Sequence, residues 1–230
     1  MSKIQKLGGI AALVEAGTFI VGFVLYFTVL AAADYGSLDV DPLQHARFLA
    51  DHQAIMYAWN LIIYVLFGVC LVVLALALYE RLIVKTTTLS PREGGAIAKI
   101  ATVFGFIWAG LVIASGMVAN IGASLIVEMV GKDPEQAASL WLAMHFVVDG
   151  LGGGNEIVGG LWILLISWAA LLHHKLSKAL SYFGIAVGAV GIVTLIPALT
   201  ELGAVFGLGS IVWFLWIGRS LMLDNVSKPS

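Results

Sequence analysis

The sequence predicts an all-α fold: a polytopic membrane helix bundle of six transmembrane helices, with both termini in the cytoplasm. Of the 230 residues, 60% are hydrophobic and only 11% are charged, whereas a soluble domain carries about 25% charged residues. Six apolar segments are long enough to cross a hydrocarbon core about 30 Å thick, which takes about 20 helical residues. The basic residues also alternate between the two sides, as the positive-inside rule requires.

The six segments fill one predicted domain, residues 1–230, and are joined by short connections. The first follows a short basic stretch but is too long for the apolar region of a signal peptide, so we expect it to be a retained helix. Glycines at 150 and 152–154 interrupt the fourth, and Pro197 lies at the end of the fifth, where a helix tolerates it. The predicted helices cover residues 7–33, 53–79, 96–127, 136–172, 179–199 and 202–222.

The orientation follows from the lysines and arginines near the helix ends. With the N-terminus inside, only Arg47 and Lys132 fall on the outer side, and the outer connections are acidic. This predicts a multi-pass protein of the inner (plasma) membrane. The remaining ten basic residues fall on the cytoplasmic side: Lys3, Lys6, Arg81, Lys85, Arg92, Lys99, Lys175, Lys178, Arg219 and Lys228.

Two helical hairpins share a weak sequence pattern. "FLADH" (48–52) enters the second segment and "WLAMH" (141–145) lies in the fourth, and each apolar stretch then ends in a basic turn. "KIATVFG" (99–105) and "KALSYFG" (178–184) follow those turns. Because the two hairpins also share direction, the pattern favours a parallel duplication of helices 2–3 and 4–5. Chance similarity between apolar sequences is the alternative.

Three stretches carry a resemblance to a known family. They are "KLGGIAALVEAG" in the first segment, "DPEQAASLWLAMH" before the glycines, and "KALSYFGIAVGAVGIV" after a basic turn. From about Lys6 to Leu199, the order of features resembles a bacterial integral-membrane family called domain of unknown function 4386. The resemblance implies about six helices, an unassigned activity and no catalytic residues. The acidic "VVDGLGGGNE" (147–156) departs from the family pattern, so any role of its residues rests on this sequence alone.

Three acids lie inside the predicted helices, where an ionisable group costs about 2.5–3.5 kcal/mol. They are Glu15, Asp149 and Glu156. Helical spacing puts His145, Asp149 and Glu156 on one face of the fourth segment. The intervening glycines should break that helix or allow a close helix contact.

Counting along the helices predicts an outward-facing polar vestibule. Asn60, Asn120, Asn155 and Glu156 fall at one depth at about 1.5 Å per residue, with Asp149 towards the outside and Glu15 deeper. Half-helix ends at such a break bind ions or polar ligands in transporters. Asparagines and acids near an interface also serve simply to bond neighbouring helices, and this alternative stays open.

His52 and His145 hold equivalent places in the suspected repeat, and two facing histidines can ligate haem or a metal. Neither lies in a metal-binding spacing, and an interfacial histidine without a ligand is the alternative. We therefore expect no cofactor, with haem as the rival possibility.

The leading hypothesis is a small transporter or sensor that binds a small ligand, proton or cation in the vestibule. The rival is a structural or haem-anchoring subunit of a larger membrane complex. The bilayer is the expected partner, with a second copy or a complex partner possible. A net charge of −2 gives no basic surface for nucleic acid. We do not expect an enzyme, since no nucleophile motif is present and "GLGGGN" lacks the strand and lysine of a phosphate loop.

The topology can be tested with reporter fusions. Fusions after Thr87 and after Lys228 should report the cytoplasm, and one after Asp133 should report the outside, because ten of the 12 basic residues then lie inside. A C-terminal reporter on the outer side would contradict the six-helix topology.

Overall fold

The structure is a computed structural model that describes residues 2–83, 93–153 and 156–223. All regular secondary structure in these residues is helical. The elements are α1 (Lys3–Leu25), η1 (Tyr26–Leu30), η2 (Ala31–Ala33), α2 (Pro42–Asp51), α3 (Gln53–Asn60), η3 (Leu61–Leu66), α4 (Phe67–Ile83), α5 (Glu93–Val130), α6 (Pro134–Val148), η4 (Asp149–Gly153), α7 (Ile157–His173), α8 (Lys178–Val193), η5 (Pro197–Leu199) and α9 (Leu202–Leu223).

The all-α prediction is confirmed, and the protein is membrane-embedded. Within the part of the chain that the structure describes, five helical runs are long and apolar enough to cross a membrane. The predicted segment 179–199 is shorter than the others: α8 has 16 residues and is followed by the turn η5. At about 1.5 Å per residue, α8 spans about 24 Å. The five runs are Lys3–Ala33, Gln53–Ile83, Gly95–Val130, Pro134–His173 and Leu202–Leu223.

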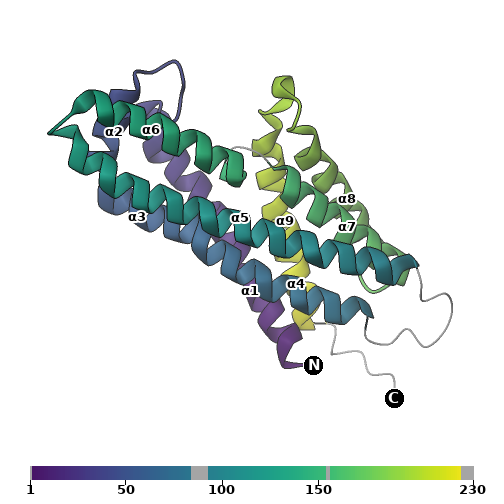
Figure 1. Cartoon of the computed structure of the whole chain (residues 1–230). Helices are drawn as coiled ribbons and strands as arrows, with labels where there is room; N and C mark the ends of the chain where they lie inside the picture. The colour runs from purple at the N-terminus through teal and green to yellow at the C-terminus, as the bar shows by residue number, and fades with distance from the viewer. Residues whose placement is uncertain (1, 84–92, 154–155, 224–230) are drawn as a thin grey trace. The chain divides into compact units, whose positions relative to one another are not determined.

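One helix was not predicted from the sequence. α2 lies in the connection that the sequence analysis treated as an outer loop, and it lies beside α6 (Figure 1). Its carboxylate N-cap, Asp41, accepts the Leu43 N–H at 2.9 Å, and Pro42 opens the first turn. α6 begins in the same way, with Asp133 accepting the Gln136 N–H at 3.0 Å. An aspartate cap followed by proline is therefore what starts both helices.

The predicted interruption of segment 136–172 is confirmed. α6 ends at Val148, the π-helical turn η4 follows, and Gly152 has a φ of 128° inside it. Only glycine adopts such a conformation without strain. The prediction that His145, Asp149 and Glu156 share one helical face is therefore wrong for Glu156, which is the N-cap residue of the separate helix α7.

The chain folds into two compact units, and two of the boundaries between them fall within α1 and α5. Of the described residues, unit 1 takes 2–17, 68–83, 93–110 and 156–223. Unit 2 takes 18–67 and 111–153.

Unit 1 is held together by small residues that let helix backbones meet. A Cβ on Gly160 would lie 2.7 Å from the Gly188 carbonyl oxygen, so α7 and α8 touch through their main chains. A Cβ on Gly9 would lie 3.1 Å from the Gly218 carbonyl oxygen, so the backbones of α1 and α9 also approach closely. Such seams replace the hydrophobic effect as the source of helix association in lipid.

The connections assigned to the cytoplasm share contacts in unit 1. The Gln5 amide donates to the Ala77 carbonyl at 2.6 Å, which ties the start of α1 to α4. Arg81, at the end of α4, donates through Nη2 to the Lys175 carbonyl at 3.3 Å, in the turn between α7 and α8. The alternation of basic residues therefore agrees with the contacts within this unit.

Unit 2 has a core where α2, α3, α5 and α6 meet the end of the first helical run. The aromatic centre of this core is Trp141, which is 1% exposed. Its buried members are Leu30, Ala46, Leu49, Met56, Ala123, Ile126, Ala137 and Trp141.

The α7–α8 seam predicts a sharp difference between two glycines of unit 1. Gly188→Ala would place a Cβ 2.6 Å from the Gly160 carbonyl oxygen, and such overpacking costs about 1–3 kcal/mol. The matched control Gly110→Ala meets no atom within 4 Å and should be neutral or stabilising by about 0.5–1 kcal/mol. Thermal unfolding in detergent measures both. Equal midpoints for the two variants would contradict the close backbone contact.

Candidate functional site

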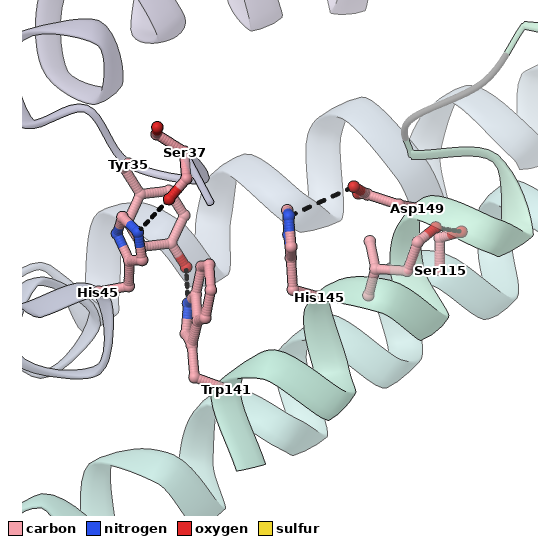
Figure 2. A network of polar contacts seen from close by, with 8 residues as sticks. Tyr35, Ser37, His45, Ser115, Trp141, His145 and Asp149 are labelled. Atoms are coloured by element: carbon pink, nitrogen blue, oxygen red, sulfur yellow. Dashed lines mark hydrogen bonds and ion pairs between the residues drawn. The ribbon is translucent and has the colours of Figure 1, made fainter. Parts of the chain in front are cut away.

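The candidate site is a stack of aromatic and imidazole rings in unit 2. The Trp141 indole lies between two histidines: the His45 ring centroid is 4.2 Å from it at an interplanar angle of 26°, and the His145 centroid is 4.8 Å away at 15°. His45 comes from α2, whereas Trp141 and His145 come from successive turns of α6 (Figure 2). One indole therefore meets an imidazole on each face.

The segment before α2 holds this stack in place through hydrogen bonds and an edge-on ring contact. The Trp141 Nε1–H donates to the Tyr35 hydroxyl at 3.2 Å, and the Tyr35 ring meets His45 edge-on. His45 Nε2 lies 2.9 Å from the Ser37 carbonyl oxygen, which can only accept, so this nitrogen carries the proton (Figure 2). His45 is 1% exposed, and its hydrogen bond offsets the burial of a polar ring.

His145 connects the stack to the helix break. Its Nε2 lies 3.4 Å from the Asp149 Oδ2, one turn further along at the first residue of η4 (Figure 2). The side chains are 20% and 41% exposed, so this pair lies nearer the surface of unit 2 than His45 does. At the same level, the Ser115 hydroxyl donates to the Val148 carbonyl at 3.3 Å. α5 thereby satisfies a carbonyl where the α-helical pattern ends.

Asn60 and Asn120 are brought together in the same unit. The Asn60 Nδ2–H donates to the Asn120 Oδ1 at 3.1 Å, and the Asn120 amide donates to the Tyr57 carbonyl at 3.4 Å. Both side chains are buried. This arrangement bonds two neighbouring helices, which is the alternative that the sequence analysis left open for these asparagines.

The remaining predicted ligand- or ion-binding residues are Glu15, Asn155 and Glu156. Glu15 and Glu156 belong to unit 1, and Asn155 lies outside the described residues. Glu15 is fully buried, as predicted for a residue facing the interior, and lies close enough to Cys70 for an electrostatic interaction. The Glu156 N–H donates to the Thr194 hydroxyl at 3.3 Å, at the end of α8.

His52 ends α2 as its C-cap residue and stacks on Phe48, with ring centroids 4.2 Å apart. Its Nδ1 lies 3.0 Å from the Phe48 carbonyl oxygen. Within the described residues, no group of three or more His, Cys, Asp or Glu side chains is placed to hold a metal ion.

Sequence reasoning missed His45, which is as deeply buried as Trp141, each being 1% exposed. The candidate residues came mainly from the apolar segments and their ends, whereas His45 lies in a short helix outside them. Its signal is the spacing of His45, Phe48 and His52 at i, i+3 and i+7, which one helical face requires. Trp141 and His145 on α6 and Asp149 at the start of η4 are likewise spaced four residues apart.

Comparisons with models of protein families, with curated proteins and with solved structures find no match for this chain. The functional assignment therefore depends on the geometry of the chain itself.

The Tyr35 hydroxyl gives a prediction about alkaline pH. Burial raises the pKa of Tyr35 above its ordinary value near 10, although the hydrogen bond from Trp141 partly opposes this. The folded state therefore holds the phenolic proton more tightly than the unfolded state. Its contribution to stability is fully present below pH 10 and is lost as the pH rises through the folded pKa.

Unfolding measured between pH 8 and 12 should show this loss in the native chain. Tyr35→Phe should remove that part of the pH dependence and cost about 1 kcal/mol at neutral pH, through one hydrogen bond. An identical alkaline profile in both proteins would contradict the burial of the hydroxyl.

Proposed function

We propose that the protein is a membrane sensor whose ligand is the proton, bound at His145 beside Asp149 and Trp141. The observation that carries this proposal is the indole of Trp141 held between two imidazoles, 4.2 and 4.8 Å away. Histidine is the side chain that ordinarily changes charge between about pH 5 and 8. A purely structural stack would be equally well served by aromatic rings that do not titrate.

Protonation changes the interactions of His145 in a definite direction. A neutral imidazole stacks on the indole and lies beside Asp149, with Nε2 3.4 Å from Oδ2. A protonated imidazole gains attraction to the face of the indole, about 0.5–2 kcal/mol, and attraction to the Asp149 carboxylate 3.4 Å away. A charged ring therefore gains two attractions on this face of α6, and in this proposal acid tightens these contacts.

The structural consequence falls on the helix break. Asp149 is the first residue of η4, three residues before Gly152 with its positive φ. An ion pair between His145 and Asp149 connects the last turn of α6 to this irregular turn. In this proposal, acid pH holds the start of η4 against α6, and alkaline pH releases it.

The buried polar groups of unit 2 favour a sensor over a transporter. Apart from His45, those in the described residues are amides and hydroxyls: Thr18, Asn60, Ser115 and Asn120. None of them ordinarily changes charge in the physiological range. The transporter alternative would use the fully buried Glu15 of unit 1 as its proton or cation site.

Trp141 provides the reporter for a direct test. A protonated imidazole against an indole quenches its fluorescence, because the charged ring accepts electron density from the excited state. Fluorescence of the protein in lipid nanodiscs should therefore fall between pH 8 and 5. The change should be absent in His145→Gln, and should move to lower pH in Asp149→Asn, where the imidazolium loses its carboxylate.

Trp141→Phe is the control for the other six tryptophans. Subtracting its signal isolates the response of Trp141. A difference signal that stays constant from pH 5 to 8, or one that persists in His145→Gln, would refute proton binding at this site.

A further inference from the structure

A second feature of unit 2 lies on another face of α6. An open, apolar groove with a cavity volume of about 500 Å³ runs between α5 and α6. Its walls include Met117, Ile121 and Leu125 on α5, and Leu140, Met144 and Val147 on α6. The residues of α6 that line the groove lie on a different face from Trp141, His145 and Asp149, because helical neighbours recur at three and four residues. The groove is therefore separate from the histidine stack.

The length of the groove matches one leaflet of a bilayer. It follows α5 from Ala114 to Ile126, which is about 18 Å at 1.5 Å per residue, and half of a hydrocarbon core is about 15 Å. Ile121 is 63% exposed and Met117 is 55% exposed, so the groove opens sideways. Methionines at 117 and 144 give it adaptable walls, since the unbranched thioether fits irregular shapes.

A charged pair lies beyond one end of the groove, on the same face of α5 as the residues that line it. Glu128 follows Leu125 by three residues, and its carboxylate pairs with the Lys132 ammonium at 2.6 Å. Both side chains are more than half exposed. Asp133 and Glu135 follow immediately, so this end carries one cation and three acids. An anionic headgroup would be repelled here, whereas a headgroup with an ammonium beside its phosphate finds a partner for each charge.

We propose that this groove binds one phospholipid with a zwitterionic, amine-bearing headgroup. An acyl chain fills the groove between α5 and α6, the lipid ammonium meets Glu128, and the lipid phosphate meets Lys132. The size of the groove, its length of one leaflet and the charge order at its mouth together favour a lipid over a second copy of this chain. This inference is independent of the proton-sensing proposal.

Native mass spectrometry on protein released from nanodiscs tests the occupant. With phosphatidylethanolamine and phosphatidylglycerol present in equal amounts, the native chain should retain one phosphatidylethanolamine. Ile121→Trp should fill the groove and lower retention several-fold. Val103→Trp is the matched control, because Val103 is an apolar residue of α5 with similar exposure, 55%, outside the groove. The double variant Glu128→Gln and Lys132→Gln should keep a lipid but lose the headgroup preference.

Three results would overturn the proposal. They are equal retention of both lipids by the native chain, unchanged retention in Ile121→Trp, and a native dimer that Ile121→Trp converts to a monomer. The last would identify a second copy as the occupant. If Ile121→Trp does not give a single folded species, Ala114→Leu fills the other end of the groove and allows the same decision.

Discussion

The contacts of the Trp141 indole are the interaction on which unit 2 depends. The ring is 1% exposed, donates its N–H to Tyr35 and has an imidazole on each face. It thereby joins α6 to α2 and to the segment just before α2, both of which lie far from α6 in the sequence. A large aromatic ring supplies area and one polar atom at low conformational cost. The histidines around it add polar ring nitrogens, one 2.9 Å from the Ser37 carbonyl oxygen and one 3.4 Å from the Asp149 carboxylate.

The bilayer explains why the irregular backbone occurs where it does. Without water, every backbone N–H and C=O needs a partner within the protein. Where α6 ends and η4 begins, the Ser115 hydroxyl donates a hydrogen bond to the Val148 carbonyl. Where α7 begins, the Thr194 hydroxyl accepts a hydrogen bond from the Glu156 N–H. The interruption is therefore supported by side chains on neighbouring helices in each unit. Gly152 is the residue that makes it sterically possible.

Much of the fold could be predicted, because a spanning helix requires a long apolar segment, and few other structures have such a segment. The glycines at 150–154 likewise indicated the break. α2 was missed because ten residues with a polar face carry no such signal, and only local features indicate it: the Asp41–Pro42 cap and the spacing of His45, Phe48 and His52. For the site, the spacing of His145 and Asp149 predicted that they share one helical face, and the structure brings them to 3.4 Å. No spacing within one helix could predict that His45 reaches the other face of Trp141, because that contact depends on how α2 packs on α6.

The proposed sensor requires that His145 takes up a proton in the physiological range while it is stacked on Trp141. Nitrogen-15 NMR of histidine-labelled protein in lipid measures this directly, with His145→Gln identifying the signal. The account predicts that the His145 ring nitrogens convert to the doubly protonated form between pH 8 and 5. It also predicts that the proton on His45 Nε2 persists at pH 8, because it is donated to the Ser37 carbonyl. A His145 ring that remains neutral down to pH 5 would contradict the account.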